Sequence, residues 1–363
     1  MTVMRRSKCR RRLSLRQIGM RRDYTIHVPP ETCQSRMCSQ SIAHSRTDGC
    51  AQPREKTHTT VYITREGTTM KIAITTPTGN IGSKLTDRLL ETGEHDLVLL
   101  ARKPESVSQA TDRGATVVTG DLADRDYVIR ATEGVDALFW VNPPNYTTDD
   151  FAGFYRNLTE NAVAAIKQNK IKRVVVISSI GAHLGEGVGP VNAFKQVEQL
   201  FRDSGAETII LRPTYFMENL MQSAPSIAEA ESIFLPVSGG ATVSMIATDD
   251  IADASLKALT DGSMKSRVWP LHGPKDYSFD EAAKIIGDTL GKNVKHVQID
   301  HDQALAAMKE MGVSEHVAGL FVEMHEAIDT GRMQPEYPRS DESTTPTPLE
   351  SFVKTTMAPA IKQ

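Results

Sequence analysis

The stretch MKIAITTPTGNIGSKL, residues 70–85, decides the fold. Its first half is a short apolar run, which is typical of a buried strand. A turn rich in Thr, Pro and Gly follows. Ile81, Leu85 and Leu89 then stand four positions apart, which predicts one face of a helix that ends at Gly93. A strand, a glycine-containing turn and a helix in this order form the first half of a βαβ unit.

The same alternation continues along the next 130 or so residues. Short apolar segments predict five further strands, and amphipathic segments predict helices between them, including long ones near 149–169 and 192–204. Buried strands that alternate with helices form a parallel sheet covered on both faces. We therefore predict an α/β fold of the Rossmann type, a doubly wound parallel sheet. The six predicted strands are residues 71–75, 96–101, 116–120, 137–141, 173–179 and 207–213.

After Pro213 the rhythm changes. Strand-like segments become sparse, at TVSMIA, RVWPLHG and VKHVQID, and helical patterns dominate. Ser278 and Glu281 have the spacing of a capping box at the start of one such helix. We predict a dinucleotide-binding domain at 70–213 and a smaller, mostly helical substrate lobe at 214–363 that is interleaved with it, because ligands of this fold bind at the carboxyl ends of the strands.

The first 69 residues differ from the rest in composition. They carry 14 Lys and Arg against 5 Asp and Glu and contain no Phe or Trp. Such a segment cannot bury enough surface to offset its chain entropy, so we expect a disordered basic extension. It resembles an organelle transit peptide. Alternatively the start is assigned too early, and Met70, which opens the first strand directly, is the true first residue; we favour this interpretation.

The remaining residues carry 28 Lys and Arg against 40 Asp and Glu. This acidic body argues against nucleic acid as a partner, and no apolar run is long enough to predict a membrane span. We expect a cytoplasmic protein, monomeric or homodimeric, with a small-molecule substrate. We predict no metal site, because the four cysteines have no zinc-type spacing. They are Cys9, Cys33, Cys38 and Cys50.

The turn at 75–82 has the context that a dinucleotide fingerprint requires. Gly79 lets backbone approach a pyrophosphate, and Gly82 lets the helix pack on the sheet. The helix N-terminus offers free N–H groups to phosphates. Thr76 replaces the glycine of the tightest turn, and Pro77 removes one donor, so the turn is altered. The alternative is a plain strand–helix turn without a ligand.

Arg102 and Lys103 follow the second predicted strand. An acidic residue commonly stands there in NAD-binding proteins and binds the ribose 2′-hydroxyl. Here the first acid is Glu105. Two cations suit a 2′-phosphate, so we predict that NADP(H) is favoured over NAD(H). The alternative is a solvated pair of surface cations.

Several motifs together resemble the NmrA-like family of atypical short-chain dehydrogenases and reductases. Family members often read T-G-A-T-G-x-x-G where this chain has TTPTGNIG. The resemblance continues through GDLAD (120–124), VVVISSIGA, KQVEQLFRDSG and ILRPTYFMEN (210–219), and it covers about residues 70 to 355. It implies an NAD(P)-binding oxidoreductase, similar to quinone and azo-dye reductases of the family.

The resemblance and the fingerprint together predict the binding residues. Asp121 matches the residue that the family places near adenine, and Phe216 and Asn219 resemble positions that line the substrate pocket. The predicted cofactor-binding residues are Thr75, Thr76, Thr78, Gly79, Asn80, Ile81, Gly82, Arg102, Lys103, Asp121, Leu122, Asn142, Pro143, Ser178 and Lys195.

The catalytic prediction starts from a missing tyrosine. Typical short-chain dehydrogenases use Tyr-x-x-x-Lys, in which the tyrosine protonates the substrate oxygen. Lys195 matches the family lysine, but Val191 stands where the tyrosine belongs. An electron-poor acceptor takes hydride directly and needs positioning more than an acid. We therefore predict a quinone-like acceptor, with Lys195, His183 and Tyr146 as candidate catalytic residues and Ser179 as a further neighbour.

Bland alternatives stand beside each assignment. In the alternative interpretation, Lys195 contacts the ribose or is a solvated helix residue, and His183 is an ordinary loop histidine. Phe216 and Asn219 are then part of the core. The missing tyrosine also fits a non-enzymatic redox sensor that binds the dinucleotide and acts through a protein partner. A sugar-nucleotide epimerase ranks last, because it needs the tyrosine.

Overall fold

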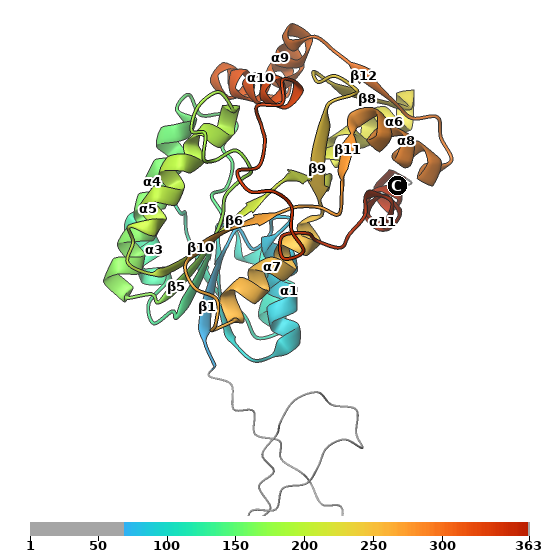
Figure 1. Cartoon of the computed structure of the whole chain (residues 1–363). Helices are drawn as coiled ribbons and strands as arrows, with labels where there is room; N and C mark the ends of the chain where they lie inside the picture. The colour runs from blue at the N-terminus through green and yellow to red at the C-terminus, as the bar shows by residue number, and fades with distance from the viewer. Residues whose placement is uncertain (1–68, 362–363) are drawn as a thin grey trace, which may run out of the picture. The chain divides into compact units, whose positions relative to one another are not determined.

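The computed structural model describes residues 69–361, and our predictions for residues 1–68 lie outside them. The described part forms one compact unit (Figure 1). Its centre is a seven-stranded sheet in the order β10-β6-β5-β4-β1-β2-β3, with every neighbouring pair parallel. The strands are β1 (Lys71–Thr75), β2 (Asp96–Ala101), β3 (Thr116–Thr119), β4 (Ala137–Trp140), β5 (Arg173–Ile177), β6 (Glu207–Pro213) and β10 (Arg267–Leu271).

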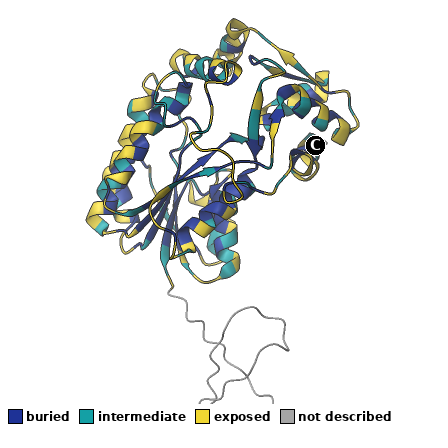
Figure 2. Cartoon of the chain, viewed as in Figure 1, coloured by how far each residue is buried: buried dark blue, intermediate teal, exposed yellow. Residues whose placement is uncertain are grey.

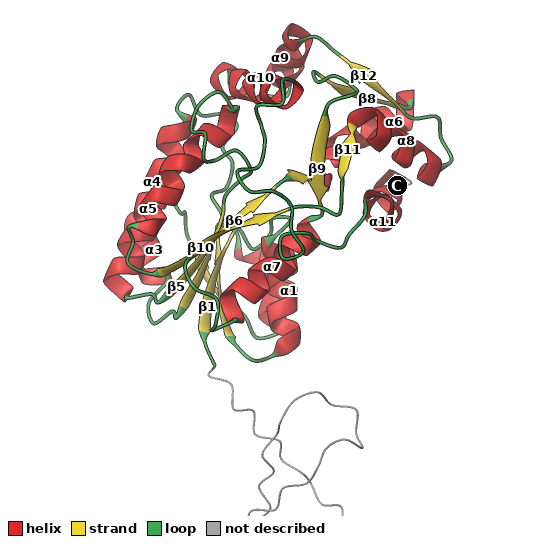
Figure 3. Cartoon of the chain, in the orientation of Figure 1, coloured by secondary structure: helices red, strands yellow, loops and turns green. Residues whose placement is uncertain are grey.

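Helices cover both faces of this sheet (Figure 3). On one face α1 (Gly82–Thr92), α2 (Ser108–Asp112) and α7 (Thr248–Thr260) pack over Ile72, Leu99 and Leu211. On the other face α3 (Arg125–Ala131), α4 (Phe151–Asn169) and α5 (Phe194–Arg202) pack over Leu138 and Trp140. The five inner strands between the two layers are almost fully buried, whereas the edge strands β3 and β10 are partly exposed (Figure 2). Short turns of 3₁₀ helix precede α2 and α5, at η3 (Pro104–Val107) and η4 (Gly189–Ala193).

The predicted fold class is confirmed, and six of the seven strands start at the predicted residues. The seventh strand, β10, was expected in the substrate lobe, but it pairs with β6 at the edge of the central sheet. Pro270 lies in this strand, and proline is tolerated there because an edge strand leaves one row of N–H groups unpaired. The helix α7 also belongs to the sheet domain, so the chain crosses between the two parts more than once.

The second part of the chain forms a lobe around a core of its own, which includes Met217, Tyr277, Phe279 and Ile286. Helices make up most of its regular structure, and five short strands accompany them. The strands are β7 (Tyr215–Phe216), β8 (Ser232–Leu235), β9 (Thr242–Ile246), β11 (Asp276–Ser278) and β12 (Lys295–Gln298). The helices are η5 (Met217–Ser223), α6 (Ala224–Ala230), α8 (Phe279–Leu290), α9 (His301–Glu310), α10 (Glu315–Asp329), α11 (Leu349–Phe352), η6 (Val353–Met357) and α12 (Ala358–Ile361).

Two details of this lobe follow from local sequence. Ser278 caps α8, since its hydroxyl accepts a hydrogen bond from the Glu281 N–H at 3.0 Å, as its spacing predicts. The irregular segment 339–348 runs along the sheet edge, where Glu342 pairs with Arg267 at 2.7 Å and Thr344 bridges to His272. Among residues 69–361, no helix combines the length and apolarity that a membrane crossing requires.

Candidate functional site

The turn between β1 and α1 is a tight cradle. Thr76 adopts a left-handed backbone with φ +48°, a conformation that glycine takes freely and a β-branched residue rarely does. Its carbonyl accepts a hydrogen bond from the Gly79 N–H at 3.0 Å and closes the turn. A Cβ on Gly82 would lie 2.2 Å from the same carbonyl oxygen, so only glycine fits where α1 meets the turn. Gly82 therefore has the packing role that the fingerprint predicts.

At Gly79, unlike at Gly82, no contact within the protein requires a glycine. Its φ is not in the left-handed region, and a Cβ there would meet its nearest atom at 3.4 Å, an ordinary contact. The free space above it is therefore open to a ligand. The N-cap residue of α1 is Ile81, which makes no side-chain cap hydrogen bond, and the first turn of the helix has no acidic residue. An uncapped helix N-terminus beside an open glycine is suited to a pyrophosphate, so the residues present fit a dinucleotide.

Two of the predicted cofactor residues have their side chains fully engaged inside the protein. The Thr75 hydroxyl accepts from the Val141 N–H at 2.9 Å and lies 3.2 Å from the Phe139 carbonyl oxygen, which joins the ends of β1 and β4. The Asn142 amide accepts from the Trp140 indole N–H at 2.6 Å and donates to Thr159 at 3.3 Å. These residues shape the carboxyl edge of the sheet and offer a ligand mainly their backbone.

Arg102 and Lys103 lie exposed directly after β2, as expected. Within residues 69–361 neither side chain has an ion-pair partner, although most arginines of this part are paired with a carboxylate. Asp121 follows β3 and accepts a hydrogen bond from the Ala123 N–H at 2.9 Å through one oxygen. Its neighbour Leu122 is buried, so its side chain belongs to the core. Two unpaired cations at the end of β2 suit an anionic group there.

Ser178 belongs to a buried ionic network. Its hydroxyl donates to the Glu198 carboxylate at 2.6 Å, and that carboxylate also accepts two hydrogen bonds from Arg212, each at 2.7 Å. Arg202 and Glu336 extend the network at its exposed ends. Burial raises the pKa of the Glu198 carboxyl, but hydrogen bonds from Arg212 and Ser178 outweigh it, so the pKa lies below its ordinary value. Ser178 therefore holds α5 to β6, and its hydroxyl is already used.

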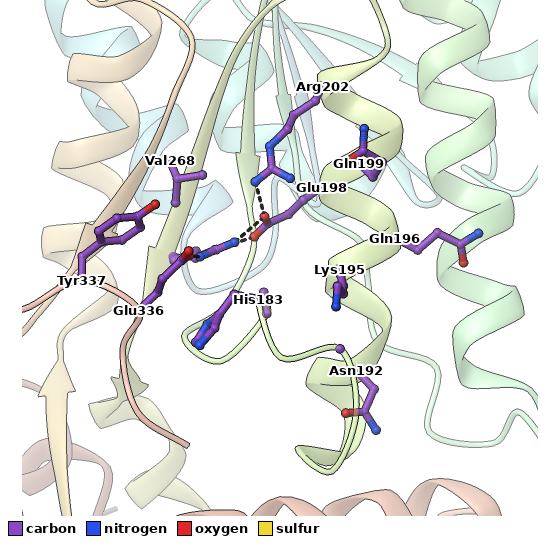
Figure 4. Close-up of a pocket in the computed structure, with 13 residues that line it drawn as sticks. His183, Asn192, Lys195, Gln196, Glu198, Gln199, Arg202, Val268, Glu336 and Tyr337 are labelled. Atoms are coloured by element: carbon purple, nitrogen blue, oxygen red, sulfur yellow. Dashed lines mark hydrogen bonds and ion pairs between the residues drawn. The ribbon is translucent and has the colours of Figure 1, made fainter. Parts of the chain in front are cut away.

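A pocket of about 690 Å³ lies between α5, the sheet edge at β10 and the segment at Glu336 (Figure 4). His183 and Lys195, both predicted as catalytic, line it. The Lys195 ammonium donates to the Leu184 carbonyl at 3.3 Å, and the His183 Nδ1 is buried without a hydrogen-bond partner among the described residues. The glycine turn, Arg102 and Asp121 contribute nothing to its walls. The structure thus brings His183 and Lys195 together in the lining of one pocket.

Tyr146, the third predicted catalytic residue, and Val191, which replaces the usual tyrosine, do not line this pocket. Val191 is buried in η4, so an apolar side chain fills the position of the usual tyrosine. Tyr146 follows β4 and is 45% exposed. Its ring packs at 6.0 Å, centroid to centroid, against Phe321 of α10. The Tyr146 carbonyl accepts from the Ser314 N–H at 2.8 Å, which ties this loop to the lobe.

The predicted substrate residues Phe216 and Asn219 lie on β7 and η5, with Asn219 exposed and Phe216 half-buried. Between them is Glu218, which our sequence reasoning did not single out. Its buried carboxylate accepts from the Thr248 N–H at 3.0 Å and from Lys84 of α1 at 3.3 Å. The signal that could have found it is a carboxylate directly after the apolar segment YFM (215–217).

Comparison with known proteins agrees with this geometry. The family model described as NAD(P)H-binding matches residues 77–262, about half of the chain. The chain belongs to this NAD(P)H-binding family. The match includes the glycine turn, β2 and β3, and it confirms the resemblance inferred from the motifs.

Several named relatives of this NAD(P)H-binding chain are reductases or oxidoreductases. It is 29% identical to an NAD(P)H azoreductase of Xenophilus azovorans, over 68% of this chain and 84% of the relative. It is 23% identical to quinone oxidoreductase 2 of Escherichia coli, over 80% of this chain and 97% of the relative. Its fold matches the Citrobacter triphenylmethane reductase complexed with NADP(H), with a TM-score of 0.67 and 23% identity over 79% of this chain and 99% of that one. The comparisons support an NAD(P)H-dependent oxidoreductase.

Proposed function

We propose that this protein is an NADPH-dependent reductase that transfers hydride to a quinone-like or similarly electron-poor small molecule. The observation that carries the proposal is the pairing of a turn that fits a dinucleotide with a buried valine at position 191. The named azo and quinone reductases support the acceptor class.

The binding roles follow from the geometry of the carboxyl edge. The N–H groups at the start of α1 hold the pyrophosphate above Gly79. Arg102 and Lys103, exposed and unpaired within the described chain, bind the 2′-phosphate, which favours NADPH over NADH. Asp121 lies beside the adenine, and the backbone at Asn142 and Pro143 approaches the nicotinamide half. Bound NADPH supplies the hydride.

The proton balance decides the acceptor. Reduction of a quinone to a hydroquinone takes a hydride from NADPH and a proton from solvent, and it leaves NADP⁺. Val191 has no proton to donate, so an ordinary carbonyl, which needs an acid at its oxygen as hydride arrives, is a poor substrate. A quinone delocalises the charge, so water can protonate it after the transfer.

The remaining candidates have lesser roles in this proposal. Lys195 contributes a positive charge that stabilises the cofactor ribose or a negatively charged product. Phe216 and Asn219 form part of the acceptor pocket, and Tyr146 closes it from the β4 loop. His183 is not required as an acid.

The test is oxidation of NADPH and NADH against 1,4-naphthoquinone, an azo dye and an aliphatic aldehyde. We expect turnover with the quinone or the dye, little with the aldehyde, and a preference for NADPH. A tight NADPH complex that turns over none of the three acceptors would contradict the proposal and favour the sensor alternative.

A further inference from the structure

Glu218 connects three elements of the fold. Its side chain is 7% exposed and lies in η5, directly after the β7 strand. Both carboxylate oxygens accept from the Thr248 N–H, at 3.0 and 3.1 Å, and one also accepts from the Thr248 hydroxyl. The ammonium of Lys84 in α1 lies 3.3 Å from the same oxygen. One carboxylate of the lobe thus binds α1 and α7, two of the three helices on this face of the sheet.

The helix α7 depends on this carboxylate for its cap. Its N-cap residue is Ala247, which has no side-chain oxygen to accept from the first N–H groups. Those groups need a partner when they are buried, and a negative charge is favoured at the positive end of the helix dipole. Glu218 supplies both from 30 positions away in the sequence. The position of η5 is therefore fixed relative to the start of α7.

Lys84 makes the connection to the glycine turn. It is the third residue of α1, within the first turn of the helix that meets the cofactor phosphates. Its ammonium also contacts the Thr248 hydroxyl at 2.8 Å and Asp249 at 2.6 Å. One turn later Arg88 pairs with Asp249 at 3.1 Å and Asp253 at 2.5 Å. These contacts clamp the phosphate-binding end of α1 to α7, and through Glu218 to η5.

The residues next to Glu218 in the sequence are predicted to bind the acceptor. Asn219 follows it and Phe216 precedes it by two residues, and both are predicted to line the acceptor pocket. We propose that Glu218 is a positioning residue that couples the cofactor turn to the acceptor segment 214–223. Binding of NADPH at the start of α1 then stabilises the acceptor segment, because the same ion pairs restrain both. This inference rests on the proposed function for the identity of the acceptor segment.

Hydrogen–deuterium exchange of the full chain with and without NADPH tests the coupling without requiring turnover. In the wild type we expect NADPH to slow exchange in 76–84 and, through Glu218, in 214–223, each by about fivefold or more. In Glu218→Gln, which keeps the shape and loses the charge, slowing in 76–84 remains and slowing in 214–223 is lost. Lys84→Met, at a side chain that is 26% exposed, serves as a second variant that does not disturb the α7 cap.

The matched control is Glu207→Gln. Glu207 also pairs with an arginine, Arg173 at 2.9 Å, but at the amino ends of the strands. It should leave both responses unchanged. Because Glu218 and Lys84 act through one contact, the double variant should lose no more of the 214–223 response than either single variant.

The coupling and the reductase activity can fail separately. Slowing of exchange in 214–223 that persists in both Glu218→Gln and Lys84→Met would overturn the coupling, as would its absence in the wild type when 76–84 responds. A wild type that shows both responses yet oxidises no NADPH with any acceptor retains the coupling and refutes the proposed function. In an active wild type, Glu218→Gln should raise KM for 1,4-naphthoquinone by about tenfold and change the NADPH Kd by less than about threefold.

Discussion

Arg212 and Glu198 form a buried bidentate pair, with two contacts of 2.7 Å between side chains that are 7% and 1% exposed. Glu198 lies on α5 and Arg212 on β6, so the pair joins the helix that carries Lys195 to the sheet. Removing one partner of such a pair leaves a buried charge without compensation. The wall of the pocket beside His183 and Lys195 therefore depends on this buried ion pair, which also engages the Ser178 hydroxyl.

We expect Glu198→Ala to lower the free energy of unfolding by about 3–5 kcal/mol. Glu207→Ala, at a carboxylate that is 25% exposed, should cost about 1 kcal/mol or less. Urea unfolding of both variants at pH 7 measures the difference. Equal losses would show that burial of Glu198 does not strengthen its pair.

The pH dependence of that pair has a definite sign. The folded-state pKa of Glu198 lies below its ordinary value, because the Arg212 and Ser178 hydrogen bonds outweigh burial. A carboxyl with a depressed pKa stabilises the fold above its unfolded pKa and loses that contribution as pH falls through the folded pKa. The gap in stability between wild type and Glu198→Gln should therefore be constant from about pH 5 to 8 and close below about pH 4.

His325 predicts a separate loss of stability at milder acidity. Burial in α10 lowers its pKa to about 4, and its Nδ1 has no hydrogen-bond partner among the described residues. Between about pH 6.5 and 4 this histidine is protonated in the unfolded chain but neutral in the folded protein. The free energy of unfolding therefore falls as pH drops through that range. His325→Gln should reduce the slope of the stability curve over that range, and the lowered pKa values of His272 and His296 should leave a smaller slope. His316→Gln is the control at an exposed histidine of the same helix, and a curve that keeps its full slope in His325→Gln would contradict the assignment.

The backbone conformation of Thr76 predicts a substitution that stabilises the protein. Its φ of +48° costs a β-branched residue about 1–2 kcal/mol relative to glycine. Thr76→Gly should therefore raise the free energy of unfolding, by about 1 kcal/mol after the added flexibility of the unfolded chain. Lys170 ends α4 with φ +56°, so Lys170→Gly is a matched control. Both should stabilise in urea unfolding, but Thr76→Gly alone should alter the Kd for NADPH. Loss of stability in Thr76→Gly would show that the Thr76 side chain outweighs its backbone strain.

The fold was predictable where local pattern and burial agree. The strands β1 and β2 have the predicted bounds, because each is a buried apolar run that ends at polar residues. The strands β7, β8 and β11 were not predicted, and β7 and β11, with two and three residues, are too short to show a period. The strand β10 was seen but placed in the lobe, because nothing in RVWPLHG records that its partner is β6, 60 positions earlier.

The carboxyl edge of the sheet was predictable, but the hydrogen-bond partners of its residues were not. Polar residues that follow the predicted strands lie at that edge. The sequence could not reveal that the Thr75 hydroxyl binds β4, that Asn142 binds Trp140, or that the Ser178 hydroxyl binds Glu198, because each partner comes from a distant segment. The Lys84–Glu218 contact, 134 positions apart, has the same origin.

Arg102 gives the test of cofactor choice. Its guanidinium is exposed and without an ion pair within residues 69–361, so it is available for a 2′-phosphate. Losing one charge-assisted contact costs about 1.5–3 kcal/mol, which is roughly ten- to a hundredfold in affinity. Arg102→Ala should weaken NADPH by that factor and NADH by less than about threefold. Arg113→Ala, an arginine that already pairs with Asp87, should leave both Kd values unchanged. Equal weakening of NADPH and NADH would exclude Arg102 from 2′-phosphate recognition.

The role of protons in the reaction gives the final prediction. Val191 is buried and supplies no acid, so hydride transfer to a quinone should not depend on a protonated side chain. We expect kcat for 1,4-naphthoquinone with saturating NADPH to be nearly flat from about pH 6.5 to 8.5, since a rate that required an imidazolium would fall across that range. His183→Ala should change kcat by less than about tenfold, whereas loss of a required general acid costs about 10²–10⁴-fold. Lys195→Ala, at a residue that lines the same pocket, should act mainly on the Kd for NADPH. A steep fall in kcat with rising pH that disappears in His183→Ala would instead make His183 the proton donor, and the acceptor class would then extend to carbonyls that need one.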